Sequence, residues 1–327
     1  MSAAASHARF RARRAAVPTV VREALAAPAP EVPPRFRRVE RWAVTGTGAS
    51  EGVAHALVWL LRRYARKDAC FVPLSYFAAA PPSSPWDGLV VVSQGISPNA
   101  RLALADADRA DATVVITAEP EHPALLRRSD ALVVAHPPSD ESSLLVRVCG
   151  PAAAMVAAAR FVDALMALDG EASYFDLGAL PARLDALCAA PGVEVAGEIA
   201  LVTEEATAPV AHALRWKWLE AVASCDPPCW DVLQFAHGPW QYACERRLTL
   251  VTLERDASPL FDRLASMLSP KCHTLLRLRA ELPAPACFVE LDAMLTAVVD
   301  ASLPATGRDL EDWPGRGTDG PLYDLGR

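Results

Sequence analysis

The chain has 327 residues, of which 52% are hydrophobic and 22% charged, a composition typical of a globular protein long enough for two hydrophobic cores. Its formal net charge of −7 argues against nucleic acid as the main partner. No run approaches eighteen apolar residues, which argues against a membrane-spanning helix. The eight cysteines include no CxxC pair, so we expect reduced thiols in a cytoplasmic protein and no metal site.

The first residues of the chain are rich in arginine. Residues 1–17 hold four arginines, Arg22 adds a fifth, and no acid precedes Glu23. We expect a disordered tail, with an organelle transit peptide as the alternative, because the segment lacks the apolar core of a secretory signal. The proline-rich residues 28–34 predict a stiff linker, so residues 1–34 are expected to lead into the first domain.

The next hundred residues alternate between two kinds of pattern. Short β-type runs are separated by stretches with helical periodicity, which predicts a parallel sheet with right-handed crossovers. The expected strands are residues 42–45, 70–74, 89–92, 113–117 and 131–135, and the expected helices are 51–63, 101–110 and 123–128.

The most informative of these strands is LVVV at residues 89–92, which is followed directly by SQGISPN. An all-apolar run predicts a buried parallel strand, and ligands of open α/β sheets bind at the carboxyl ends of strands. Hydroxyl and amide side chains beside the start of a helix favour an anion such as phosphate. The alternative is an ordinary serine–proline turn with a helix N-cap.

A long apolar helix is expected at residues 152–168, and a second α/β pattern follows it. The expected strands are 198–202, 248–253 and 273–279, and the expected helices are 181–190, 209–224, 260–268 and 288–301. From Pro304 the chain is rich in Gly, Pro and Asp and is predicted to be irregular. We therefore expect two domains, 35–168 and 169–303, and a tail, 304–327.

Four sequence motifs resemble those of the sugar isomerase (SIS) family. GTGAS at 46–50 is similar to the family's glycine loop, and SQGISPN at 93–99 to its Ser-Gln-Ser-Gly-x-Ser/Thr phosphate loop, shortened by one residue. ALRWKWLE, ending at Glu220, is followed by FAHGP, whose His237 lies 17 residues further on (237 − 220), close to the family's spacing. The tail 307–327 is similar in style to family tails that fold over the active site, but it has no lysine.

The resemblance implies a particular fold and assembly. The arrangement resembles that of tandem SIS proteins, such as the isomerase half of glutamine–fructose-6-phosphate aminotransferase and the phosphoglucose/phosphomannose isomerases. We therefore expect an α/β chain with two flavodoxin-like parallel-sheet sandwich domains in tandem. It further implies a homodimer with shared active sites and a reaction that needs no cofactor, while the net charge and the lack of a spanning run argue against nucleic-acid and membrane partners.

The resemblance also implies an activity, the aldose–ketose isomerisation of a sugar phosphate or aminosugar phosphate, with amination or deamination at C2 as a coupled variant. Glu220 would be the base, because a carboxylate in a partly dry pocket has a pKa near neutrality. His237 would open the sugar ring, since imidazole exchanges protons at physiological pH. The residues expected to bind the ligand and its phosphate are Ser50, Ser93, Gln94, Ser97 and Asn99, and the tail candidates are Arg316 and Tyr323.

Departures from the family pattern keep other interpretations open. The shortened loop and the missing tail lysine favour a sugar-phosphate-binding protein without catalysis, or an enzyme of specialised metabolism with an unusual substrate. Glu204 and Glu205 are reserve candidates for the base. Arg215 and Lys217 would either stabilise an enolate oxygen or be solvated charges.

The dimer interface is also left open between two interpretations. The apolar helix 152–168 and the tryptophans Trp216 and Trp218 could supply that interface, and packing in the core is the alternative.

Overall fold

A computed structural model describes residues 2–79, 86–128, 130–138, 141 and 143–325. The chain divides into two compact units, each with its own parallel sheet. The five-strand unit comprises Thr19–Glu141, Cys149–Leu177 and Pro314–Arg327, and the four-strand unit comprises Met1–Pro18, Ser142–Val148 and Gly178–Trp313. The predicted α/β class with parallel sheets is confirmed.

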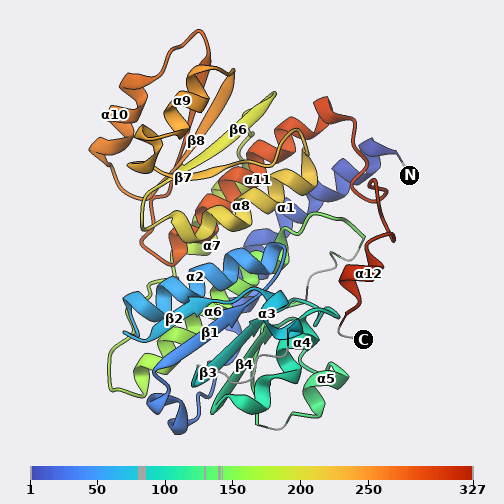
Figure 1. Cartoon of the computed structure of the whole chain (residues 1–327), viewed down its shortest axis with the longest axis vertical. Coiled ribbons are helices and arrows are strands. Elements are labelled where there is room, and N and C mark those ends of the chain that lie inside the picture. Colours follow the sequence, from blue (N-terminus) through green and yellow to red (C-terminus); the bar gives the residue numbers. More distant parts are fainter. Residues whose placement is uncertain (1, 80–85, 129, 139–140, 142, 326–327) are drawn as a thin grey trace. The chain divides into compact units, whose positions relative to one another are not determined.

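The five-strand unit has the strand order β2-β1-β3-β4-β5, which is the flavodoxin-like order. Helices α2 and α6 pack on one face of this sheet, and α3, α4 and α5 cover the other (Figure 1). The strands are β1 (Arg41–Thr45), β2 (Asp68–Phe71), β3 (Gly88–Val92), β4 (Ala112–Thr117) and β5 (Leu132–Ala135). The helices are α2 (Ala49–Arg63), α3 (Leu74–Ala78), α4 (Ala100–Ala105), α5 (Pro123–Leu126) and α6 (Cys149–Ala167), with 3-10 turns η1 (Pro34–Arg38) and η2 (Ala107–Arg109).

Strand β3 is buried over its whole length, as its apolar sequence predicts. Leu89 and Val91 belong to the core beneath α3, α4 and α5. Because successive side chains of a strand point to opposite faces, Val90 and Val92 turn to the face of α2 and α6. Burial on both faces holds the end of β3 rigidly, which positions the loop that follows it.

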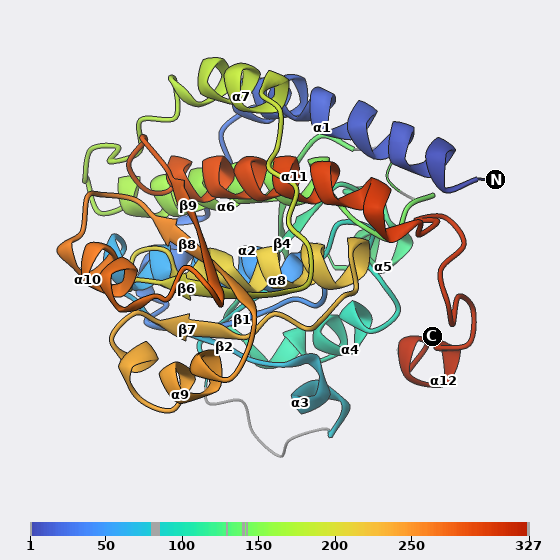
Figure 2. The same cartoon turned by 90° about the horizontal axis from the view of Figure 1, so that it is seen from above.

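The four-strand unit has the strand order β7-β6-β8-β9, which matches the first four positions of the other sheet. Its strands are β6 (Glu198–Thr203), β7 (Cys229–Asp231), β8 (Leu248–Glu254) and β9 (His273–Arg279). Helices α7 (Leu180–Ala189), α8 (Ala208–Ala221) and α11 (Ala286–Thr306) pack together, while η3 (Gln234–Ala236), α9 (Pro239–Cys244) and α10 (Pro259–Met267) lie on the opposite side of the sheet (Figure 2).

The arginine-rich N-terminus is not the disordered tail that we expected. Residues Ala3–Ala26 form helix α1. Phe10 is fully buried, and the guanidinium of buried Arg14 donates to the Asp300 carboxylate over 3.1 Å and to the Leu187 carbonyl. This part of α1 therefore packs within the four-strand unit.

Helix α6 is the described helix that is long and apolar enough to cross a membrane, judged by length and composition. Of its most apolar window, 83% is buried inside the protein. Trp218 on α8 is also fully buried. Core packing, the alternative to a dimer interface, therefore accounts for α6 and for Trp218.

The tail is less irregular than predicted, because Gly320–Tyr323 forms the short helix α12. Residues 326–327 of the predicted tail lie outside the described residues.

Candidate functional site

The candidate ligand site lies at the point of the five-strand sheet where the order of the parallel strands reverses, on either side of β1. Strand β1 pairs with β2 on one side and β3 on the other, so the loops after β1 and β3 meet at a topological switch point. A Cβ atom on Gly46 would lie 2.7 Å from the Ser50 carbonyl oxygen and 3.2 Å from that of Val92. Only glycine fits at this crossing, and Gly48 turns the chain into α2 with a φ of 58°.

The two serines of the loop 93–99 are held by backbone amides. The Ser97 N–H donates to the Ser93 Oγ over 3.2 Å, and the Ala100 N–H donates to the Ser97 Oγ over 3.3 Å. Because each hydroxyl accepts one of these bonds, its own hydrogen can be donated to an acceptor. The loop is therefore prepared to bind a ligand oxygen.

Ile96, between these serines, has an unusual backbone conformation. Its φ is 46°, in the left-handed region that β-branched residues rarely adopt, and its side chain is fully buried in the core. Such strain persists where the surroundings over-determine the backbone, and it is concentrated at functional sites.

Helix α4 is shorter than predicted. It ends at Ala105, where residues 101–110 were expected to be helical, and the chain continues as the 3-10 turn η2. The Ser97 hydroxyl already accepts from the first N–H group of α4, so this helix leaves fewer free N–H groups for an anion than we expected.

Gln94 connects the loop to two neighbouring elements. Its carbonyl accepts hydrogen bonds from the Thr117 hydroxyl and the Ala118 N–H, each over 3.0 Å, at the end of β4. Its side-chain amide lies against Gly150, where a Cβ would overlap it. Gln94 thus fastens the loop to β4 and to the start of α6.

The start of α6 is capped by a carboxylate. Glu141 is fully buried and accepts from the N–H groups of Cys149 and Gly150 over 2.7 and 2.8 Å. It therefore supplies the negative charge that a 19-residue helix favours at this end.

Asn99 contacts the C-terminal tail. Its side-chain Nδ2 donates to the Leu322 carbonyl on α12 over 2.8 Å. Of the tail candidates, Arg316 is exposed and Tyr323 is 47% exposed. The tail thus reaches the loop through its backbone at Leu322.

Several buried polar atoms at the carboxyl edge of this sheet have no hydrogen-bond partner among the described residues. They include the Thr45 hydroxyl, at the end of β1, the Asn99 Oδ1, in the loop after β3, and the His136 Nε2, directly after β5. Buried polar groups are normally paired, and unpaired ones mark places that bind water or a ligand.

Burial of His136 predicts a specific loss of stability in acid. Burial lowers the pKa of its imidazole to about 4, against weaker opposing effects of the Pro137 carbonyl and Glu141. The folded pKa lies below the unfolded value of 6.5, so this stability is present above pH 6.5 and is lost progressively as the pH falls from 6.5 to about 4. We expect urea unfolding to show that the wild type loses about 2 kcal/mol more than His136→Asn between pH 7 and pH 5. Equal losses would contradict the assignment.

In the four-strand unit, Glu220 lies in the last turn of α8 and is half-buried. Burial raises the pKa of its carboxyl group to about 7, although the positive charges of Arg147 and Lys217 oppose the shift. A carboxylate that titrates near neutrality is suited to proton transfer.

The basic residues beside Glu220 are not solvated charges without partners. Lys217 is buried, and its Nζ donates to the Asp292 carboxylate over 2.5 Å and to the Thr296 hydroxyl over 2.8 Å. Arg215 pairs with Asp226.

His237 is exposed, unlike Glu220. It follows η3 and precedes α9, and its backbone N–H donates to the Gln234 carbonyl over 2.9 Å. Nearby rings pack around Phe235, whose centroid lies 5.7 Å from that of Trp230 and 6.1 Å from that of Trp240. These aromatic contacts support the backbone that presents the imidazole.

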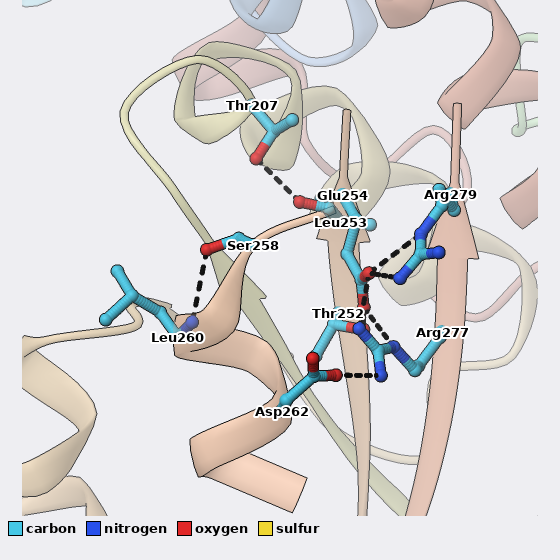
Figure 3. Close-up of polar contacts among 9 residues, drawn as sticks. All are labelled: Thr207, Thr252, Leu253, Glu254, Ser258, Leu260, Asp262, Arg277 and Arg279. Carbon is cyan, nitrogen blue, oxygen red and sulfur yellow. Dashed lines mark hydrogen bonds and ion pairs between the residues drawn. The ribbon is translucent and has the colours of Figure 1, made fainter. Parts of the chain in front are cut away.

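The carboxyl ends of β8 and β9 carry a dense ionic cluster (Figure 3). Glu254 is fully buried, and it accepts from the Thr252 hydroxyl over 2.6 Å and from the guanidinium groups of Arg277 and Arg279. These bonds lower the pKa of the Glu254 carboxyl, although burial alone would raise it. Asp262 on α10 binds another nitrogen of Arg277 over 2.7 Å.

The sequence-predicted site residues thus fall into two groups. Ser50, Ser93, Gln94, Ser97 and Asn99 all belong to the five-strand unit, and Glu220 and His237 to the four-strand unit. The sequence analysis missed Glu119 and Glu141, although Glu119 follows a predicted strand so closely that the sheet-edge rule applies to it.

Comparisons with known proteins show the fold. No protein-family model matches the chain, and no curated protein matches it in sequence. Among solved structures, the C-terminal domain of glucosamine-fructose-6-phosphate aminotransferase from Francisella tularensis is similar, with a TM-score of 0.71, 14% identity, and coverage of 94% of this chain and 98% of that one. Tagatose-6-phosphate ketose/aldose isomerase from Escherichia coli has a TM-score of 0.59 and 16% identity, covering 94% and 93%. Glucosamine-6-phosphate deaminase from Thermotoga maritima has a TM-score of 0.62 and 13% identity, covering 94% and 97%.

Proposed function

We propose that the two units are SIS-type domains in tandem and that the chain isomerises a sugar or sugar phosphate between its aldose and ketose forms. The observation that carries the proposal is the loop 93–99, whose two serine hydroxyls are oriented by backbone amides at the switch point of the sheet. The similar solved structures, whose names include a ketose/aldose isomerase and a sugar-phosphate deaminase, support the same class of ligand.

In this proposal the ligand is bound by Ser93 and Ser97, with Ser50, Gln94 and Asn99 completing the loop region. Binding energy from a part of the sugar remote from the reacting carbons would orient those carbons for the reaction. The tail would order this region through the bond between Asn99 and Leu322, with Arg316 and Tyr323 as its candidate ligand groups.

The chemistry assigned to the other unit is a proton transfer. Glu220 would take the proton from C2 of the open-chain aldose while the C1 carbonyl oxygen gains a proton, forming an enediol. It would then return its proton to C1 while the C2 hydroxyl gives up its proton and becomes the ketone. The reaction needs no oxidant, because one proton moves from C2 to C1 and the hydroxyl proton lost at C2 balances the one gained at the C1 oxygen. His237 would open the ring beforehand by moving a proton between the ring oxygen and the anomeric hydroxyl. We propose a homodimer as the assembly, which light scattering on the purified chain would test.

The loop assignment predicts a loss of ligand affinity when its hydroxyls are removed. Thermal-shift titration with glucose, fructose and their 6-phosphates should raise the melting temperature of the wild type. In Ser93→Ala and Ser97→Ala, we expect the affinity for the best ligand to fall about 3- to 10-fold each, because each variant loses one hydrogen bond.

The matched control is Ser266→Ala, whose hydroxyl binds a carbonyl of its own helix. It should leave ligand affinity unchanged. If no sugar or phosphosugar binds, or if the loop variants bind as the wild type does, the proposed function is wrong.

A second candidate is a sugar-binding protein without catalysis, which is favoured by a tail that has no lysine between residues 304 and 327. Ligand binding without exchange of the C2 hydrogen for solvent deuterium, in the wild type, would select this candidate.

A further inference from the structure

The loop 93–99 is an unusual place for a group with two negative charges. It contains no lysine or arginine. Two of its amides are already used, since the Ser93 N–H donates to the Ile116 carbonyl over 3.0 Å and the Ser97 N–H donates to the Ser93 Oγ over 3.2 Å. A phosphate dianion bound here would depend on hydroxyls, on the remaining backbone amides and on whatever charge the neighbouring elements supply.

Apart from Arg101 on α4, the helices beside the loop supply little positive potential. Helix α4 has six residues, and its first amide is taken by the Ser97 hydroxyl. Helix α6 is long, but the carboxylate of Glu141 already occupies its first N–H groups. The positive end that would attract a phosphate is therefore neutralised from within the chain.

A further carboxylate lies directly against the loop. The Glu119 Oε1 is 3.3 Å from the position of a Cβ on Gly95. The backbone of Glu119 is tied to the loop, because the Glu119 N–H donates to the Thr117 hydroxyl over 3.1 Å, and that hydroxyl donates to the Gln94 carbonyl. No ion pair of this carboxylate occurs within the described part of the chain. Its negative charge therefore acts on any group bound at Gly95.

We infer that Glu119 is a specificity residue that selects against a dianionic phosphate, so that the group bound by the loop is an uncharged oxygen of an unphosphorylated sugar. The inference rests on the proposed function, which assigns the loop to the ligand, and it narrows the substrate class. The Ser93 and Ser97 hydroxyls donate equally well to a neutral sugar oxygen, and Glu119 can accept from a sugar hydroxyl.

The test compares glucose and fructose with their 6-phosphates by calorimetric titration of the full chain. We expect the wild type to bind the free sugars at least as tightly as the phosphosugars. Glu119→Gln should tighten phosphosugar binding about 3- to 10-fold and leave free-sugar binding within about twofold, from the repulsion of charges several ångströms apart at a protein surface. Glu119 is exposed, so its variant is expected to fold.

Glu121→Gln is the matched control. It is also exposed, two residues further on, and changes the net charge equally, so it should alter neither affinity. Arg101→Gln is the third variant and shows whether this side chain holds a phosphate, since Arg101 on α4 is the nearest basic residue in sequence after the loop.

Two results would overturn the inference while leaving the proposed function intact. One is a wild type that binds phosphosugars tenfold tighter than free sugars. The other is phosphosugar binding that is insensitive to Glu119→Gln but lost in Arg101→Gln. If neither kind of sugar binds to the wild type or to any variant, the proposed function and this inference both fail.

Discussion

Replacing Glu220 with glutamine is expected to lower kcat for sugar isomerisation about 100- to 10,000-fold, the usual contribution of a positioned general base. Glutamine keeps the shape of the side chain but cannot accept the C2 proton. Ligand affinity should stay within about threefold, because the proposal assigns binding to another loop. Exchange of the C2 hydrogen for deuterium, followed by NMR, measures the proton transfer directly. Glu245→Gln, at an exposed acid of the same unit, is the control.

The raised pKa of Glu220 also predicts the direction in which activity changes with pH. Burial raises the pKa of Glu220 to about 7, so the reactive carboxylate forms as the pH rises, and kcat/KM should increase through about pH 7. For stability the same shift acts in the opposite sense. The folded pKa of Glu220 is above the ordinary 4.5, so the stability that its carboxyl group contributes to the fold is present below pH 4.5 and is lost as the pH rises through 7. If kcat/KM does not rise through about pH 7, or if Glu220→Gln is fully active, Glu220 is not the base and the role passes to Glu204 or Glu205.

Most of the β-strands could be predicted because their sequences leave few alternatives, although β2 begins and ends earlier than the expected residues 70–74. Strand β3 is apolar at every central position, and the structure buries it completely. The loop that follows was predictable for the same reason, since a buried parallel strand must end at the ligand-binding edge. Strand β7 was missed because it has three residues and follows two prolines, too short a run for periodicity to be visible.

Helix α1 shows how one charge can conceal an amphipathic pattern. Phe10, Val17, Val21 and Ala24 are buried and recur at helical spacing, which is the signal of a packed helix. Arg14 lies in the same stripe and was interpreted as part of a solvated basic tail. Its partners, Asp300 and two carbonyls at the end of α7, are 286, 173 and 176 residues away in sequence, so local pattern could not reveal them.

The candidate site was predictable in its residue types but not in its electrostatics. The serines of the loop follow from strand position and family resemblance. The Glu141 cap and the Glu119 carboxylate depend on which loops the sheet order brings together. Strand order is a long-range property, and a single sequence does not state it.

In the four-strand unit, Glu254→Gln is expected to destabilise the protein by about 2 kcal/mol. Removing one partner of a buried ion pair typically costs about 3 to 5 kcal/mol, and the partial exposure of both arginines reduces that figure through solvent screening. The side chains of Arg277 and Arg279 are 30% and 47% exposed, while that of Glu254 is fully buried. Urea unfolding at pH 7 measures the loss. Asp262→Asn is the control, because its side chain is 70% exposed, and it should cost less than about 1 kcal/mol.

The geometry of the cluster also predicts which of its two arginines contributes more to stability. Arg277 binds both oxygens of Glu254, over 2.7 and 2.9 Å, and also Asp262, whereas Arg279 reaches only Oε2. Arg277→Gln should therefore destabilise the protein more than Arg279→Gln. The pKa of Glu254 is lowered, so its contribution is present above pH 4.5 and is lost as the pH falls through the lowered pKa. In Glu254→Gln that acid-induced loss should disappear. An unchanged acid profile in this variant, or equal effects of the two arginines, would show that the cluster is held by packing and not by its charges.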